Sequence, residues 1–224
     1  GVKVLSIVNV GEISGDAAVN LNIWRKMGQK IFSVHQGDGI NIVKLALMKT
    51  DLVVDAIYGT GFHGKMLEGA GRVIKVINKS GKPVVAVSTL DTLAHNLYGS
   101  NALVCPLLDA RKQEVYCGFY DVTGTVPYAL SENLACTPAE FVAQAREVAS
   151  ESRKDRIILL GDGYYPYAEF FQVELGNSLQ IPPAHLMLPR AAALASLGFK
   201  KACQGEFEDV FTLRPVYIRL SEAE

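Results

Sequence analysis

The densest candidate for chemistry is a glycine-rich segment in the first third of the chain. It reads Gly59-Thr60-Gly61-Phe62-His63-Gly64-Lys65-Met66 and follows a mostly apolar run, Leu52-Val53-Val54-Asp55-Ala56-Ile57. Glycines let backbone N–H groups approach a phosphate closely, and the N-terminus of a following helix adds partial positive charge. The segment therefore predicts a loop that could hold the phosphates of a nucleotide or dinucleotide.

Two familiar glycine loops match this segment only in part. The P-loop spacing G-x-x-x-x-G-K is present, but Met66 stands where a Ser or Thr normally holds magnesium. A dinucleotide-binding G-x-G-x-x-G needs an acidic residue about 20 positions further on, and residues 83–88 contain no carboxylate. A plain tight turn between a strand and a helix is a third interpretation. The pattern alone leaves all three open.

A second group of charged residues lies in the middle of the chain. Asp109, Arg111, Lys112 and Glu114 alternate in charge around a predicted turn that leads into a strand containing Tyr116. Such a cluster can order a turn through ion pairs or dock a partner, and a solvated turn with weak exposed pairs fits equally well.

Further along, Gly161-Asp162-Gly163 follows an apolar run and is interpreted as a strand-end turn in preference to a phosphate site. His63, His95 and His185 show no recognisable Ser or Cys partner, so no catalytic triad is predicted.

The elements that must position these residues alternate between strand and helix up to about residue 88. Strands are predicted at 2–10, 30–35, 52–57 and 84–87, and helices at 16–27, 40–48 and 70–78. The first helix is expected to turn Val19, Leu21, Ile23 and Trp24 inward. Strands alternating with helices predict right-handed βαβ units and a parallel sheet covered on both faces.

After residue 88 the pattern changes to a mixed one. Ser88 is predicted to cap a short helix with Asp91 at the reciprocal capping position, and Thr137-Pro138-Ala139-Glu140 to open a longer helix. Strands are predicted at 102–108, 114–122, 156–160 and 216–220, and a helix at 189–197. The fold class is therefore α/β with two packed lobes, at residues 1–88 and 89–224.

The composition excludes several classes of protein. The 224 residues are 49% hydrophobic and 20% charged, which is typical of a compact folded chain and not of a disordered one. A formal net charge of −1 argues against strong direct binding of nucleic acid. The chain has no apolar stretch of membrane-spanning length and no signal-peptide pattern, so a cytoplasmic protein is expected. Its four well-separated cysteines are expected to be buried thiols.

Part of the first lobe resembles a known family. The resemblance is carried by residues 51–62 and 76–87, which include Asp51-Leu52-Val53-Val54-Asp55 and Asn78-Lys79-Ser80-Gly81-Lys82-Pro83. These stretches resemble the YjeF N-terminal family of NAD(P)H-hydrate epimerases, and the resemblance covers about residues 4–87. The resemblance implies that Asp55 binds potassium and that residues 59–65 hold the substrate's phosphates. It also implies a cofactor-binding role for Asp16, which with Gly15 is what is kept of the family's Asn-Asn-Gly-Gly-Asp motif.

Two departures weigh against an efficient epimerase. Ile13 stands where the family has its potassium-binding Asn, and Ser88-Thr89-Leu90-Asp91-Thr92 replaces the family's Asp-Ile-Pro-Ser-Gly.

The second lobe resembles a different family. Five segments carry this resemblance, in the order Val87-Ser88-Thr89-Leu90-Asp91, Asp109-Ala110-Arg111-Lys112-Gln113-Glu114-Val115-Tyr116, Leu160-Gly161-Asp162-Gly163, Pro189-Arg190-Ala191 and Leu213-Arg214-Pro215. Together they are similar to the TsaB family of bacterial tRNA threonylcarbamoyladenosine biosynthesis. The resemblance implies an actin-like, ASKHA-type lobe and a mainly non-catalytic role beside a TsaD-like catalytic subunit and a TsaE-like ATPase. The family's Gly-Pro-Gly-Ser-Phe-Thr-Gly motif is missing, and Glu68-Gly69-Ala70-Gly71-Arg72 stands in that neighbourhood.

The chain is thus interpreted as a hybrid of two family patterns. The longer resemblance favours a non-enzymatic accessory subunit that needs no cofactor. The alternative is an epimerase that binds a dinucleotide and potassium, and the third hypothesis is a hybrid with neither activity. A homodimer is compatible with all three.

Overall fold

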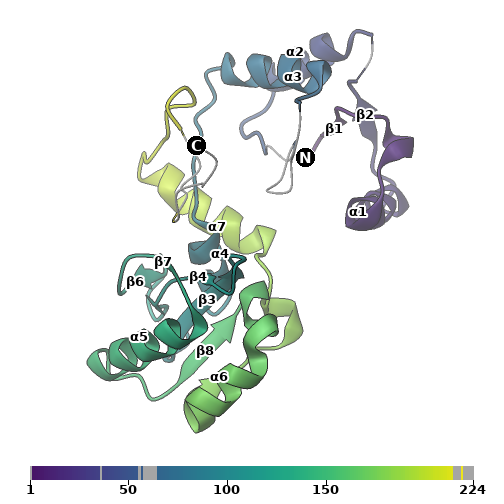
Figure 1. Cartoon of the computed structure of the whole chain (residues 1–224). Coiled ribbons are helices and arrows are strands. Elements are labelled where there is room, and N and C mark those ends of the chain that lie inside the picture. The colour runs from purple at the N-terminus through teal and green to yellow at the C-terminus, as the bar shows by residue number, and fades with distance from the viewer. Residues whose placement is uncertain (1, 36, 55–56, 58–64, 214–217, 219–224) are drawn as a thin grey trace. The chain divides into compact units, whose positions relative to one another are not determined.

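The computed structural model describes residues 2–35, 37–54, 57, 65–213 and 218, together with the backbone but not the side chain of Asp16 (Figure 1). The chain divides into two compact units, Gly1–Pro83 and Val84–Glu224, which are described separately here.

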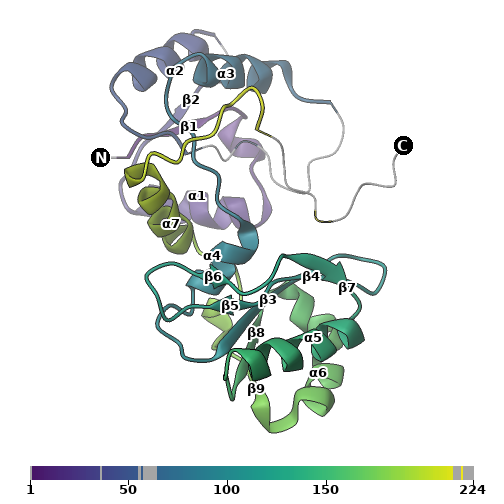
Figure 2. The same cartoon turned by 90° about the vertical axis from the view of Figure 1, so that its left-hand side faces the viewer.

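The first unit combines a short parallel sheet with helices. Its elements are β1 (Val4–Ser6), the 3₁₀ helix η1 (Val10–Glu12), α1 (Gly15–Lys26), β2 (Ile31–Ser33), α2 (Gly39–Met48) and α3 (Glu68–Asn78). Strands β1 and β2 pair in parallel, with Val4 opposite Ile31. Helices α2 and α3 lie side by side in Figures 1 and 2 and share a small buried core with Val34, Val43, Leu47 and Val73.

Three predictions for this part of the chain were wrong. The predicted strand at 52–57 is absent from its described part: Leu52 and Val54 are exposed, at 72% and 79%, because no described strand or helix covers both faces of this run. Val19 and Ile23 of α1 are also exposed, although the helix itself forms where it was predicted. The predicted strand at 84–87 is reduced to one antiparallel bridge between Val84 and Glu208.

The second unit is built on a mixed sheet. Its elements are α4 (Thr89–His95), β3 (Leu103–Asp109), β4 (Val115–Cys117), β5 (Tyr120–Asp121), β6 (Tyr128–Ala129), β7 (Leu134–Cys136), α5 (Pro138–Glu151), β8 (Ile157–Leu160), η2 (Asp162–Tyr167), α6 (Ala168–Leu175), η3 (Gly176–Ser178), β9 (Leu179–Gln180), η4 (Ala184–Leu186) and α7 (Ala191–Cys203). Strand β3 pairs antiparallel with β4 and β5 and parallel with β8. The sheet is extended by β6, β7 and β9.

Helices cover this sheet on both sides. Helix α4 lies on one side of β3, and α5 and α6 lie together on the other, in the views of both Figure 1 and Figure 2. Three aromatic rings fill the core on the α5–α6 side: Phe119 stacks on Phe141 at 5.5 Å, and Phe171 meets Phe141 edge-on at 5.6 Å. The unit therefore has a large continuous apolar core.

The helix starts predicted for this unit are confirmed. Thr137 and Glu140 form a reciprocal capping box: the Glu140 N–H donates to Thr137 Oγ1 (3.3 Å), and the Thr137 N–H donates to Glu140 Oε2 (2.9 Å). The Thr137 N–H and the Thr137 hydroxyl (2.8 Å) both donate to Glu140 Oε2, and they lower the pKa of this exposed carboxyl. Ser88 Oγ accepts from the Asp91 N–H at 3.4 Å, so Ser88 caps α4 as predicted, but in the described structure the Asp91 carboxylate accepts from the Tyr120 hydroxyl and forms no reciprocal bond to Ser88.

The cysteine prediction holds for Cys105, Cys117 and Cys136, which are buried, but is wrong for the exposed Cys203 at the end of α7. The predicted last strand at 216–220 lies outside the described residues except at Ile218.

The Asp91 carboxylate has a partner in the sheet. The Tyr120 hydroxyl lies 2.8 Å from Asp91 Oδ1 and 2.9 Å from Asn133 Oδ1, and the Tyr120 side chain is almost fully buried. Burial, followed by the nearby Asp91 charge, raises the pKa of the Tyr120 phenol, so this group stays protonated and able to donate. The contact ties α4 to β5.

Removing this hydroxyl should destabilise the second unit. In Tyr120→Phe the Asp91 and Asn133 oxygens lose their buried donor, which typically costs about 1–3 kcal/mol. Urea unfolding followed by circular dichroism measures the loss. Tyr128→Phe is the matched control, because Tyr128 is 70% exposed. Equal midpoints for the two variants would contradict the prediction.

Candidate functional site

The carboxyl ends of β3 and β8 bring two acidic residues together. These strands run parallel, so Asp109 at the end of β3 lies beside Asp162, two residues beyond β8. Asp162 Oδ1 accepts from the Asp109 N–H at 3.2 Å. Gly161 has φ of 109°, and a Cβ there would lie 1.9 Å from the Leu107 carbonyl oxygen. Only glycine permits this approach, and Gly161-Asp162-Gly163 is the strand-end turn that the sequence favoured.

The charged turn after β3 has an unusual backbone. Arg111, Lys112 and Gln113 are three consecutive non-glycine residues with positive φ, at 62°, 50° and 64°. The left-handed region costs about 1–2 kcal/mol per residue, so hydrogen bonds must hold the turn. Asp109 Oδ1 accepts from the Arg111 N–H (2.9 Å), and the Glu114 N–H donates to the Arg111 carbonyl (2.9 Å).

The turn also contains the ion pair that the charge pattern suggested. Arg111 Nη1 lies 3.5 Å from Asp109 Oδ2, but the guanidinium is 86% exposed, so the pair itself contributes little stability. Tyr116 lies within β4, half-buried, opposite Leu108 of β3 and Ala135 of β7. The structure thus presents Arg111 to solvent on a fixed backbone, with Asp109 anchored behind it.

The predicted phosphate loop falls mostly outside the described residues. Asp55, Gly59, Thr60, Gly61, Phe62 and Gly64 lie there, as does the side chain of Asp16. Lys65 is described and exposed, three residues before α3. The ligand assigned to this loop stays a prediction.

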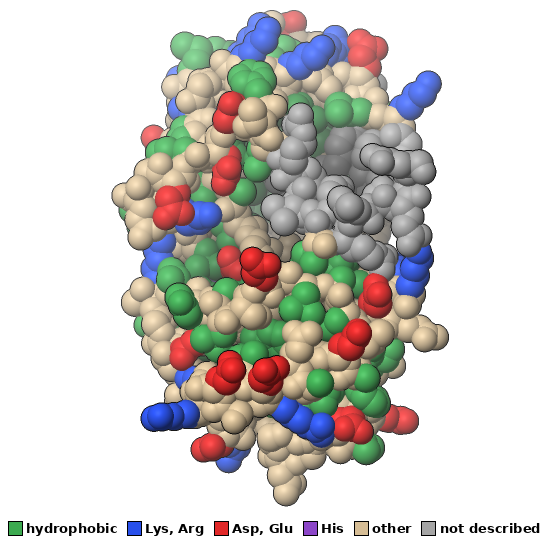
Figure 3. Space-filling model, turned by 60° about the vertical axis from the view of Figure 1, so that its left-hand side comes forward, with side chains coloured by type: hydrophobic (Ala, Val, Ile, Leu, Met, Phe, Trp, Pro, Cys, Tyr) green, Lys and Arg blue, Asp and Glu red, His purple; other side chains and the backbone are tan. Residues whose placement is uncertain are grey.

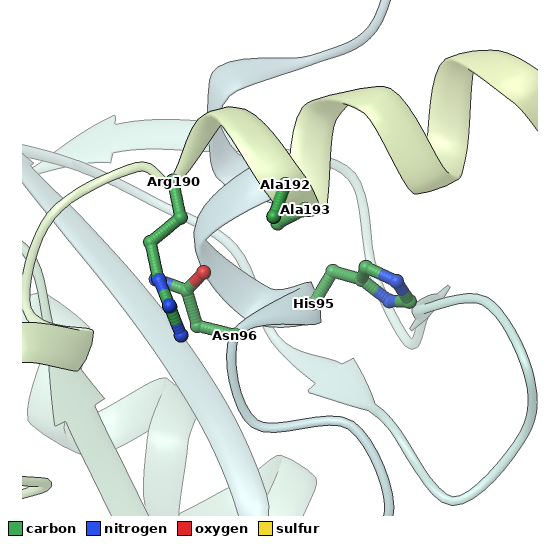
Figure 4. Close-up of a pocket in the computed structure, with 5 residues that line it drawn as sticks. All are labelled: His95, Asn96, Arg190, Ala192 and Ala193. Carbon is green, nitrogen blue, oxygen red and sulfur yellow. The ribbon is translucent and has the colours of Figure 1, made fainter. Parts of the chain in front are cut away.

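A pocket that the sequence did not predict lies between the end of α4 and the start of α7. It encloses about 220 Å³ and is lined by His95, Asn96, Arg190, Ala192 and Ala193 (Figure 4). The Asn96 amide donates to the carbonyls of Leu186 (3.0 Å) and Leu188 (2.8 Å), and Asn96 Oδ1 is buried with no partner among the described residues. Arg190 precedes α7 and contributes no side-chain cap. The pocket therefore offers donors and an acceptor together.

His95 gains a serine partner in this pocket. Its Nε2 lies 3.2 Å from Ser196 Oγ, and its Nδ1 is buried without a partner in the described structure. Burial, and secondarily the positive charge of Lys200, lowers the pKa of His95. Nothing in the sequence signals this pair, because the two residues are 101 positions apart and meet only through the packing of α4 on α7.

The surface charges of the described residues are mixed. On the face shown in Figure 3, acidic and basic side chains are interspersed, with no continuous basic stripe across the part coloured by type.

Within the described ranges, no group of three or more His, Cys, Asp or Glu side chains is arranged to hold a metal ion. None of the helices described there is both long and apolar enough to span a bilayer.

Comparison with protein families matches two different models to the chain. The model for the YjeF-related protein N-terminus matches residues 1–89, and the model for TsaD, tRNA N6-adenosine threonylcarbamoyltransferase, matches residues 61–224. The chain belongs to the TsaD family. The predicted hybrid arrangement is confirmed, with the two matches overlapping at residues 61–89.

Curated relatives of this TsaD-family chain show the same division. It is 42% identical over 86 residues to the bifunctional NAD(P)H-hydrate repair enzyme Nnr of Moorella thermoacetica, and 35% identical over 143 residues to the tRNA threonylcarbamoyladenosine biosynthesis protein TsaB of Bacillus subtilis. These matches cover 38% and 63% of the chain. They span only 16% of the first relative's length and 58% of the second's.

One solved structure supports the mixed α/β fold of this TsaD-family chain. An uncharacterised Pseudomonas aeruginosa protein with similarity to peptidase YeaZ superimposes with a TM-score of 0.50 at 21% identity, covering 90% of the chain and 82% of its own length. YeaZ from the same organism gives 0.47 at 23% identity, with coverages of 84% and 88%.

The environment of His95 predicts its titration. Its pKa should fall below the ordinary value of 6.5, so that His95 is neutral at pH 7. Because the folded pKa is lowered, the His95 contribution to stability is present above pH 6.5 and is lost as the pH falls through the folded pKa. NMR titration of the His95 ring, assigned with His95→Gln, measures this.

A pair of lysine variants tests the cause of the shift. Lys200→Met should raise the pKa of His95 partway back, because it removes the nearby positive charge. Lys201→Met is the control, since Lys201 pairs with Glu206 at 3.6 Å. A His95 pKa at or above 6.5 in the unmodified chain would contradict the prediction.

Proposed function

We propose that the chain is a TsaB-like accessory subunit in tRNA N6-threonylcarbamoyladenosine biosynthesis that binds a TsaD-type catalytic subunit. The observation that carries this is the TsaD-family match over residues 61–224, together with 35% identity to a TsaB protein over 143 residues. An actin-like second lobe belongs to the proposal. It is supported by the mixed sheet between α4 and the α5–α6 pair, and by the likeness to the YeaZ-related structure.

The turn around Arg111 is the surface that we assign to the partner. Its three left-handed residues raise the free energy of the turn, which a relaxed solvated loop would avoid. Backbone strain of this kind is concentrated at functional sites in proteins. Arg111 is exposed, yet its backbone is fixed through Asp109, Glu114 and the strand ends. A pre-positioned arginine is a frequent anchor in protein interfaces, because little entropy is lost when it binds.

Calorimetric titration with a bacterial TsaD-type catalytic subunit tests the proposal. We expect binding at micromolar concentrations or tighter, and at least about tenfold weaker binding for Arg111→Ala, in line with a lost interface anchor. Arg153→Ala is the matched control, because Arg153 is also an exposed arginine with positive φ. Absence of binding by the folded chain at tens of micromolar would overturn the accessory role. Equal losses in both variants would overturn the assignment of the Arg111 turn alone.

A TsaE-like ATPase as a further partner and a homodimer remain predictions that follow from the same resemblance. The accessory role requires no cofactor.

A second candidate function is NAD(P)H-hydrate epimerisation. It is favoured by 42% identity to a hydrate repair enzyme over 86 residues. In this proposal residues 59–65 and Asp16 would hold the phosphates of a dinucleotide and Asp55 would supply the strand-end carboxylate. The potassium site implied by the family does not fit well, because the hydrocarbon side chain of Ile13 provides no oxygen ligand. No step is therefore assigned to that ion.

The epimerase proposal predicts a defined mutational effect. The unmodified chain should interconvert the two hydrate epimers, and Asp55→Ala should abolish the interconversion by removing the motif's carboxylate. NMR of the hydrate mixture over time measures both. Asp51→Ala is the control, since Asp51 is an exposed carboxylate four residues earlier. No interconversion by the unmodified chain would end this hypothesis.

A further inference from the structure

Two buried cysteines face each other across neighbouring strands. Strands β4 and β7 are antiparallel, with Cys117 opposite Leu134 and Cys136 opposite Val115. Residues two apart on a strand share a face, so this register places Cys117 and Cys136 diagonally on the same side of the pair. Their sulfur atoms lie 3.7 Å apart. A disulfide needs about 2.05 Å, so rotation of the side chains with a small shift of one strand would close the gap.

Cys136 lies on an edge strand, where local opening would expose its thiol to an oxidant. Strand β7 has three residues and is the last strand on its side of the described sheet, pairing only with β4. Short edge strands open locally at a lower free-energy cost than central ones, and such opening would uncover Cys136, which is 6% exposed when closed. Cys117 is fully buried on β4, which lies between β3 and β7.

The surroundings also make the two thiols unequal. The hydrogen bond between the two thiols lowers the pKa of Cys136 and, together with burial, raises the pKa of Cys117. Cys136 directly precedes Thr137, the cap of α5, and the partial positive charge of a helix N-terminus favours a thiolate there. Cys136 is thus suited to react first and Cys117 to resolve the product.

We propose that Cys117 and Cys136 form an oxidative modification site, at which a hydroperoxide converts the two thiols into an intramolecular disulfide. The Cys136 thiolate attacks the peroxide: an S–O bond forms, the O–O bond breaks, and hydroxide leaves and is protonated to water. The Cys117 sulfur then gives up its proton and attacks the Cys136 sulfenic sulfur. The S–S bond forms, the S–O bond breaks, and a second water leaves. Two thiols are oxidised and one hydrogen peroxide is reduced to two waters.

The proposed bond would change one part of the molecule. It would link β4 covalently to the edge strand β7, which leads directly into α5. It would thereby hold the capping box of α5 against the sheet and suppress the local opening of β7.

The test uses the full chain treated with hydrogen peroxide after the exposed Cys203 has been alkylated under native conditions. The protein is then denatured, the remaining thiols are alkylated with a second reagent, and peptides are analysed by mass. We expect a loss of two mass units, a linked Cys117–Cys136 peptide that thiol reductants separate, and an alkylated Cys105. Oxidation should also raise the melting temperature.

Single variants separate the two roles. In Cys117→Ser the sulfenic acid of Cys136 has no resolving thiol, so a dimedone adduct should accumulate on Cys136. In Cys136→Ser the Cys117 thiol should stay fully alkylatable. Circular dichroism checks that both variants are folded, and the unmodified chain decides the question if one is not.

Three results would overturn the proposal. The first is full alkylation of both cysteines in the unmodified chain after peroxide, under conditions that oxidise a free peptide thiol. The second is a disulfide from Cys105 in place of the Cys117–Cys136 bond. The third is oxidation of Cys136 to sulfinic acid without a disulfide.

Discussion

Strand β3 is the constraint on which the second unit depends. Within the described sheet it is the one strand with three partners: β8 along residues 103–106, β4 along 107–109, and β5 at Val104. Residues 103–107 of β3 are buried, and α4 packs on it from the side opposite α5 and α6. A strand with neighbours on both edges and helices over both faces tolerates little change.

The chemistry of the unit gathers where β3 and β8 end. Gly161 lets β8 turn directly over the Leu107 carbonyl, and that contact sets the place of Asp162. Asp162 in turn fixes the Asp109 backbone, and the Asp109 carboxylate fixes the Arg111 backbone. Each hydrogen bond in this series is modest alone, yet together they hold three left-handed residues that would otherwise relax. A glycine 50 positions away thus helps to fix the exposed guanidinium of Arg111.

The sequence was informative where local chemistry decides the structure. Thr137 with Glu140, and Ser88 with Asp91, mark helix starts through bonds spanning three residues. The Thr137–Glu140 capping box and the Ser88 cap occur as predicted, whereas Asp91 binds Tyr120 in the described structure and does not complete a capping box. The prediction of a buried strand at 52–57 was wrong. An apolar stretch is compatible with a buried strand, but burial also requires neighbouring strands and helices, which the stretch itself does not specify. Tyr120 with Asp91, and His95 with Ser196, could not be predicted, since tertiary packing alone brings them together. The Arg111 turn was predictable in part. The alternating charges indicated a turn, but no sequence pattern predicted three positive φ angles in residues other than glycine.

The two family patterns in the chain bury apolar cores of different size. The TsaD-family part is organised around a continuous core that includes Phe119, Phe141 and Phe171. The YjeF-related part buries a small core around Val43 and leaves Val19, Ile23 and Met27 exposed along one side of α1. Because a reactive site needs side chains held within about an ångström by a packed surround, the larger core of the second unit is better suited to hold one.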